Sequence, residues 1–242
     1  MADKRRSPIV DPRVAERRRS LFIKIGAAVV LIAVALGLGL WAILSNESST
    51  GDAAQVTVAT DTNAYRVTNA AAGSTPPAVL TIVEDFQCPA CKQFETQFGP
   101  VLSELRNNPA VALDYTPIAI LDRMSTTEYS SRAANASACV AQSTAGGGDF
   151  STWLAFHNAL YAQQPEEGGA GLADAQLNSI ANEAGAQNVR QCIDDRQFGD
   201  WVTETTQKTA ASQTPTVKLN GQELQLTTPD ALRDAVLQAA AK

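Results

Sequence analysis

Two cysteines separated by two residues, Cys88 and Cys91, are the side chains best suited to chemistry in this sequence. The spacing allows a reversible disulfide within one helical turn, and the residues that follow have a helical pattern. A cysteine at a helix N-terminus faces unpaired backbone N–H groups, which lower its pKa below about 8.5. Pro89 suits the first helical turn, where its missing N–H would have had no partner. We therefore expect Cys88 to be an exposed nucleophile and Cys91 the resolving thiol.

Three other uses of this cysteine pair have weaker support. A zinc site needs two more ligands, and neither Cys139 nor Cys192 has a ligand-spaced neighbour. A copper-delivery site lacks a partnering histidine, because the single histidine, His157, lies elsewhere in the sequence. An inert structural disulfide would close too short a loop to add much stability. Redox chemistry is the preferred interpretation, and we expect no metal and no bound cofactor.

The other two cysteines, Cys139 and Cys192, lie 53 positions apart. An even number of cysteines suggests pairing if the protein folds outside the cytoplasm. A disulfide that closes such a loop contributes about 4 kcal/mol in the chain-entropy account. We expect a structural disulfide here. A second redox relay is the alternative, and nothing in the sequence supports it.

The elements around the cysteine pair alternate between strand and helix. Ala78–Val83 is an apolar run typical of a buried strand, and Cys91–Arg106 has apolar residues at helical spacing. Val111–Ile120 is a second strand candidate, and Ala64–Thr68 is a short edge-strand candidate. Together they predict an α/β domain with the cysteine pair between a buried strand and a helix.

A block of helices, at about 124–208, separates these elements from the C-terminal part. Asn220-Gly221 then predicts a hairpin between strands at Thr216–Leu219 and Glu223–Leu226. Thr228 and the proline after it predict the start of the last helix. The expected order is therefore β-β-α-β, a helical block, then β-β-α.

The N-terminal region differs sharply from the rest in charge and hydropathy. Residues 1–24 carry eight Lys and Arg against three acids, and residues 25–242 carry eleven against twenty-two. The net negative charge of residues 25–242 argues against nucleic-acid binding, because phosphate groups are bound by basic surfaces. Residues 25–44 contain no charged side chain and are long enough to cross a bilayer as a helix. The Lys- and Arg-rich flank of a membrane helix stays in the cytoplasm, so we expect a cytoplasmic tail at 1–24 and a single membrane helix at 25–44. The polar residues at 45–62 predict a flexible linker. A cleaved signal peptide is the alternative.

Two motifs far apart in the sequence resemble those of one protein family. The run from Asp85 to Cys91 (Asp-Phe-Gln-Cys-Pro-Ala-Cys) and the later Thr214-Pro215-Thr216, with the helical block between them, resemble the DsbA-like branch of the thioredoxin fold. The resemblance covers residues 63–242. With the anchor, the chain looks like membrane-tethered DsbA-type proteins of Gram-positive bacteria.

The resemblance implies a cis bond between Thr214 and Pro215, next to the redox pair. It also implies that an extended substrate pairs with the backbone of Thr214, beside Pro89 and Ala90. An ordinary trans proline at the start of an edge strand is the alternative.

One position departs from the family pattern. Relatives often carry an acid six positions before the first cysteine, where this sequence has Ile82. Glu84 lies two positions further along, on the same strand face. Our hypothesis is that Glu84 exchanges a proton with Cys91, and a solvated acid at the strand end is the alternative. For His157, on an apolar helix face, we expect a hydrogen-bonded structural histidine rather than a redox-tuning one.

These expectations describe an extracytoplasmic thiol–disulfide oxidoreductase that introduces disulfides into exported proteins through Cys88 and Cys91. The resemblance implies a membrane oxidase, DsbB-like or of the vitamin K epoxide reductase type, that restores the enzyme's disulfide. A disulfide isomerase or reductase of the same fold is one alternative. A non-catalytic binding module that uses the thioredoxin groove is another.

Overall fold

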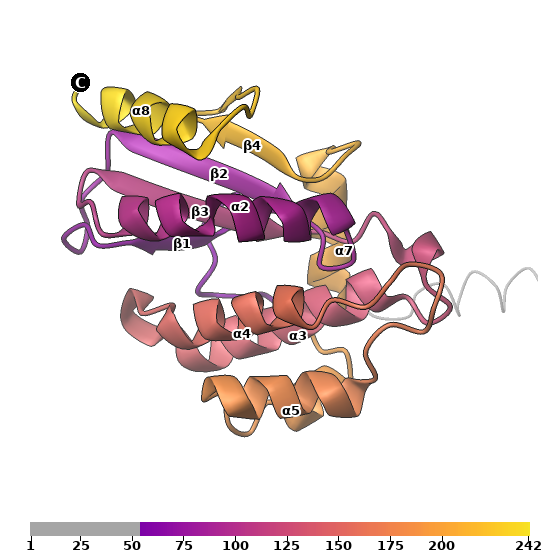
Figure 1. The fold of residues 1–242 in the computed structure, drawn as a ribbon. Helices are drawn as coiled ribbons and strands as arrows, with labels where there is room; N and C mark the ends of the chain where they lie inside the picture. The colour runs from indigo at the N-terminus through magenta and orange to yellow at the C-terminus, as the bar shows by residue number, and fades with distance from the viewer. Residues whose placement is uncertain (1–53) are drawn as a thin grey trace, which may run out of the picture. The chain divides into compact units, whose positions relative to one another are not determined.

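The computed structural model describes residues 54–242 of the chain (Figure 1). The expected cytoplasmic tail at 1–24, the membrane helix at 25–44 and the first part of the linker lie outside the described residues. Within residues 54–242 no helix has the length and apolar character needed to cross a membrane.

A mixed five-stranded sheet forms the centre of the domain, in the order β1-β3-β2-β4-β5. β2 and β3 run parallel, whereas β1 pairs antiparallel with β3, and β4 pairs antiparallel with β2 and β5. The apolar run predicted as a buried strand is therefore the central strand. The strands are β1 (Tyr65–Thr68), β2 (Ala78–Glu84), β3 (Val111–Pro117), β4 (Thr216–Leu219) and β5 (Gln222–Glu223).

The register between β2 and β4 brings the two motifs together. Val83 lies opposite Thr216, so the residues just before β4 reach the carboxyl end of β2. The chain leaves β2 at that same end and enters helix α2 (Pro89–Arg106). The Thr-Pro motif and the cysteine pair are therefore neighbours, although more than a hundred residues separate them in sequence.

Helix α2 packs against the sheet through the apolar face that the sequence predicted, and it also contacts the last helix, α8 (Pro229–Ala240). The Thr228 hydroxyl caps α8 by accepting a hydrogen bond from the backbone N–H of Ala231 at 3.2 Å. The buried residues of α2 are Cys91, Phe94, Phe98, Val101, Leu102 and Leu105.

The helical insertion forms a separate layer, in which α3, α4 and α5 lie side by side (Figure 1). Cys139 in α3 and Cys192 in α6 are joined by a disulfide, with their Cα atoms 5.9 Å apart. Tyr65 of β1 meets Trp153 edge to face and stacks with Trp201, so aromatic rings connect the insertion to the sheet. The α-helices of the insertion are α3 (Tyr129–Thr144), α4 (Ser151–Ala162), α5 (Asp174–Ala184), α6 (Arg190–Asp194) and α7 (Gly199–Thr209).

The part of the expected linker that the structure describes belongs to the domain. Val56 is 4% exposed within the core, and the backbone N–H of Thr57 donates to Oε1 of Gln142 at 2.7 Å. The structured unit therefore begins before residue 63, and residues 54–62 are not a free tether. The sequence hid this because Val56 and Val58 form too short an apolar pattern, within a polar stretch, to indicate a helix or a strand.

Two strands end earlier than predicted. β3 ends at Pro117 instead of Ile120, because the backbone N–H groups of Ile120 and Leu121 donate to the Asp85 carboxylate and not to a neighbouring strand. β5 has two residues, Gln222 and Glu223, in place of the predicted strand at Glu223–Leu226.

Candidate active site

The two cysteines of the redox pair occupy the start of helix α2. Cys88 is the N-cap residue and Pro89 the first helical residue, so Cys88 lies where backbone N–H groups point outward. Both cysteines are free thiols, and Cys91 is fully buried. Cys88 is 6% exposed, which corrects the prediction of an exposed nucleophile. Thr214, just before β4, contacts its sulfur through the backbone carbonyl at 3.2 Å.

A pocket gives access to Cys88 from outside. It has a volume of about 570 Å³ and includes Thr214 among its lining residues. Pro89 and Ala90, which were expected to contact substrate, are exposed at the surface but do not line this pocket. The other lining residues are Ile120, Leu121, Arg123, Glu167, Ala211, Ser212 and Gln213.

The surroundings of Cys88 favour its thiolate. A hydrogen bond from the Cys91 thiol is the largest of the effects that lower the Cys88 pKa to about 6, and it outweighs the opposing effect of burial. The Thr214 side chain and the backbone N–H groups of Ala90 and Cys91 lower it further. At neutral pH, Cys88 is therefore a thiolate in most molecules of the reduced protein.

Cys91 has the opposite character. Burial is the main reason that its pKa lies far above the ordinary value, and the neighbouring Cys88 adds to the effect. The negative charge of Glu84 contributes in the same direction. The pair thus combines one stabilised thiolate with one thiol that keeps its proton.

Thr214 faces Cys88 from the other motif. The peptide bond between Thr214 and Pro215 is cis. The Cys88 thiol donates to the carbonyl oxygen of Thr214 at 3.2 Å. The Thr214 hydroxyl is buried and has no other hydrogen-bond partner within residues 54–242, which leaves it free to donate to the thiolate form.

Two residues that sequence reasoning did not single out hold the loop between β2 and α2. The buried Asp85 carboxylate accepts hydrogen bonds from the Ser130 hydroxyl at 2.7 Å and from the Gln87 N–H at 2.9 Å. Burial raises the Asp85 pKa to about 6. Gln164, just after α4, donates to the carbonyl oxygens of Phe86 and Cys88, each at 2.9 Å. The insertion thus positions the active-site loop directly.

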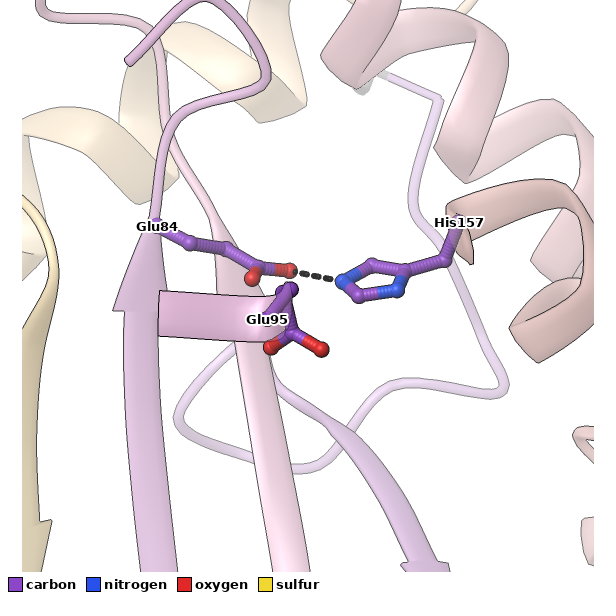
Figure 2. Close-up of side chains that lie close together, drawn as sticks. All are labelled: Glu84, Glu95 and His157. Carbon is purple, nitrogen blue, oxygen red and sulfur yellow. Dashed lines mark hydrogen bonds and ion pairs between the residues drawn. The ribbon is translucent and has the colours of Figure 1, made fainter. Parts of the chain in front are cut away.

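Glu84 points toward the insertion. Its Oε1 atom lies 2.8 Å from Nε2 of His157, and both side chains are fully buried (Figure 2). Burial alone would lower the His157 pKa, but the Glu84 carboxylate outweighs it and the value rises to about 9. His157 is therefore the hydrogen-bonded helix histidine that was expected, and its partner is the acid singled out in the sequence.

A third member of this cluster, Glu95 of α2, went unnoticed in the sequence. Burial is the main cause that raises its pKa. The Glu84, Glu95 and His157 ligand atoms all lie within 4.8 Å of one another, close enough to consider a metal ion. The helical spacing indicated this position, because Glu95 lies four residues after the buried Cys91 and therefore on the same face of the helix.

Comparisons with known proteins agree with this geometry. The thioredoxin family model matches residues 67–238. Oxidised DsbA from Mycobacterium tuberculosis is 38% identical, with a TM-score of 0.67 over 74% of this chain and 93% of that one. A reduced disulfide bond oxidoreductase (DsbG) from the same organism is also 38% identical, with a TM-score of 0.66 over 76% and 96%.

More distant proteins share the fold alone. MdbA from Corynebacterium diphtheriae, a thiol-disulfide oxidoreductase, is 20% identical, with a TM-score of 0.60 over 80% of this chain and 99% of that one. A comparison with curated proteins finds no match. The family match covers most of the chain, and the two mycobacterial relatives cover the same region at the same level of identity. With its Cys88–Cys91 pair facing a cis Thr214–Pro215 bond, the chain belongs to the thioredoxin family and is a DsbA-like thiol–disulfide oxidoreductase.

Proposed function

We propose that this enzyme works outside the cytoplasm and introduces disulfides into exported proteins. The observation that carries the proposal is the contrast between the two cysteines. Cys88 lines a pocket and has a pKa of about 6, whereas Cys91 is fully buried with a raised pKa. A stabilised Cys88 thiolate favours the reduced enzyme, and a redox protein with a stable reduced form is an oxidant.

The reaction starts from the enzyme's Cys88–Cys91 disulfide. A substrate thiolate attacks Sγ of Cys88, the bond between the two enzyme sulfurs breaks, and Cys91 leaves with the electron pair and takes up a proton. A second substrate thiolate then attacks the substrate sulfur of the mixed disulfide and releases Cys88 as a thiolate. Two electrons pass from the substrate to the enzyme. The depressed Cys88 pKa makes Cys88 a good leaving group in the second step.

The pocket beside Cys88 is suited to an extended, cysteine-containing segment. Its volume of about 570 Å³ accommodates a few side chains, and the residues Ala211, Ser212, Gln213 and Thr214 form one continuous wall. Substrate backbone pairing with this wall would place the substrate sulfur opposite Cys88. Arg123 and Glu167 also line the pocket and supply one charge of each sign.

Location and reoxidation form the second part of the proposal. The basic tail at 1–24 and the apolar segment at 25–44 support a single membrane anchor with the enzyme outside. The Cys139–Cys192 disulfide supports the same location, because disulfides persist in oxidising compartments. We propose a membrane oxidase, DsbB-like or of the vitamin K epoxide reductase type, as the partner that restores the Cys88–Cys91 disulfide. Protease treatment of intact cells should digest the enzyme domain, and protection of that domain would contradict the topology.

An isomerase or reductase of the same fold is the second candidate, and Thr214 before the cis proline is the observation that keeps it open. The reduction potential of the Cys88–Cys91 couple separates the two. We expect a value near the oxidising end of the family range, about −120 mV, and a value near −270 mV would favour the reductant.

Trapping tests the catalytic assignment directly. A Cys91→Ala variant lacks the resolving thiol, so mixed disulfides with substrates should accumulate on Cys88 and be identified by mass spectrometry. The matched control is Cys88→Ala, which should trap nothing. Equal trapping by the two variants would contradict the assignment of Cys88 as the nucleophile. If Cys88→Ser left the cellular phenotype intact, a non-catalytic binding module would be the better description.

A further inference from the structure

Three side chains from three elements meet in the interior of the domain. Glu84 lies at the end of β2, Glu95 in α2 and His157 in α4, and their ligand atoms all lie within 4.8 Å of one another. Figure 2 shows Glu84 and His157 pointing toward each other, with Glu95 beside them. The cluster therefore links the sheet, the active-site helix and the helical insertion at one point.

The hydrogen bonding of this cluster is incomplete. Oε2 of the fully buried Glu84 and Oε1 of Glu95 are buried, and neither atom has a hydrogen-bond partner within residues 54–242. Buried carboxylate oxygens are normally paired, because removing them from water without a partner is costly. Two oxygens that lack partners in the same cluster point to a positively charged ligand shared by both.

The second ring nitrogen of His157 is arranged as in metal-binding histidines. Nδ1 lies 3.1 Å from Oδ1 of Asn158, and an amide oxygen accepts hydrogen bonds without donating, so Nδ1 carries a proton. Nε2 also carries a proton at neutral pH, which it donates to the Glu84 carboxylate, so a metal ion binds at Nε2 by displacing that proton. Metal-ligating histidines commonly donate their other N–H to an oxygen, which holds the ring in the orientation needed for binding.

We propose that Glu84, Glu95 and His157 bind one divalent ion of the first transition row. Two carboxylates and a neutral imidazole neutralise a divalent charge, which leaves no net charge in the interior. Ligand atoms around such an ion lie roughly 3 to 4 Å apart when the bonds are about 2.1 Å long. The ligand atoms of the cluster lie within 4.8 Å of one another, so side-chain shifts of about 1 Å bring them to this spacing. The sequence-based expectation of no metal rested on the scarcity of histidine and did not consider two carboxylates with one imidazole.

A solvent path leads to this site. Glu95 lines a cavity of about 380 Å³ together with Asn158 and Tyr161, so water from the cavity can complete the coordination shell. Lys92 and Arg106 line the same cavity, and their charges oppose a cation. Arg106 is partly engaged, since it donates to the Tyr115 hydroxyl at 2.8 Å. Binding therefore depends on both carboxylates together, and the loss of one should weaken it at least tenfold.

The donor set also indicates which ions are preferred. Imidazole nitrogen favours Zn²⁺ and similar ions, whereas Mg²⁺ prefers ligand shells of oxygen atoms. We therefore expect Zn²⁺ to bind most tightly, Mn²⁺ more weakly and Mg²⁺ at least a hundredfold more weakly than Zn²⁺.

The first test measures metal content in the untagged full-length protein, oxidised at Cys88–Cys91 so that the active-site thiols cannot bind metal. Equilibrium dialysis against Zn²⁺, followed by elemental mass spectrometry, should give one Zn²⁺ per chain. Glu95→Gln should weaken Zn²⁺ binding at least tenfold. The matched control is Glu104→Gln, because Glu104 lies on the same helix but is exposed and pairs with Arg233. Glu104→Gln should bind as the wild type does.

The second test needs no variant. His157 is the only histidine in the chain, so an imidazole-nitrogen coupling in the pulsed electron paramagnetic resonance spectrum of the Cu²⁺-loaded protein can come from that residue alone. The proposal predicts this coupling. It is overturned if the coupling is absent, if Glu95→Gln binds Zn²⁺ as tightly as the wild type, or if Mg²⁺ competes with Zn²⁺ at equal concentration. None of these outcomes depends on the function proposed above.

Discussion

The Cys88 thiol donates a hydrogen bond to the Thr214 carbonyl at 3.2 Å, although the two residues are 126 positions apart. This contact joins the helix that carries the redox pair to the segment that precedes β4. The same segment forms one wall of the pocket through which a substrate reaches the sulfur. The segment that ends at Thr214 therefore influences both the reactivity of Cys88 and the access of substrate to its sulfur.

The pH dependence of Cys88 alkylation tests the electrostatics of the site. The rate of reaction of the reduced protein with iodoacetamide should reach half its maximum at about pH 6, because the thiolate is the reactive form. Since the hydrogen bond from Cys91 is the largest cause, Cys91→Ala should move the midpoint upward toward the ordinary value of about 8.5. A wild-type midpoint above pH 8 would contradict the site as described.

Stability should depend on pH differently in the reduced and oxidised proteins. The folded pKa of Cys88, about 6, lies below the unfolded value, so the stabilising contribution is complete above the unfolded pKa and disappears as pH falls through 6. Between pH 5 and pH 7 the unfolding free energy of the reduced protein should rise by about 1 kcal/mol relative to the oxidised protein. Urea denaturation of both forms measures this difference, and parallel pH profiles would refute it.

Asp85→Asn should destabilise the protein through the active-site loop. The carboxylate accepts from Ser130 and from the backbone N–H groups of Ile120 and Leu121, and an amide NH₂ in its place would face those donors. We expect a loss of about 2 kcal/mol in unfolding free energy. The exposed Asp195→Asn is a suitable control and should stay near the wild-type value. Equal stability of the two variants would show that Asp85 does not hold the loop.

The Cys139–Cys192 disulfide should act on stability without acting on catalysis. It closes a loop of 53 positions in the insertion, and its removal by Cys139→Ser with Cys192→Ser should cost about 2 to 4 kcal/mol. The midpoint of Cys88 alkylation should stay near pH 6. A shifted midpoint would indicate that this disulfide takes part in the redox reaction.

Glu84 needs a test in metal-free protein, because a bound ion would occupy its carboxylate. After treatment with a chelator, Glu84→Gln should slow the oxidation of a peptide dithiol at least tenfold if Glu84 exchanges a proton with Cys91. An unchanged rate in the chelated variant would remove the proton-transfer role and leave the metal site untouched.

The order of elements and the position of the redox pair were predictable from local signals. The apolar run at β2, the helical spacing after Cys91 and the Asn220-Gly221 turn each depend on neighbouring residues in the chain. The family resemblance added the pairing with Pro215, which no local pattern contains.

Chain order and residue type alone determined the chemistry available to this protein, because a reactive thiolate needs a cysteine at the start of a helix and a second thiol three positions later that donates a hydrogen bond to it. The tertiary structure decided how that chemistry is controlled. Each of the controlling contacts joins segments distant in sequence. They are the hydrogen bond between Cys88 and Thr214, the hydrogen bonds that Asp85 and Gln164 make around the active-site loop, and the cluster of Glu84, Glu95 and His157. Burial and charge interactions act through space, so these contacts exist only once the sheet and the insertion have packed together.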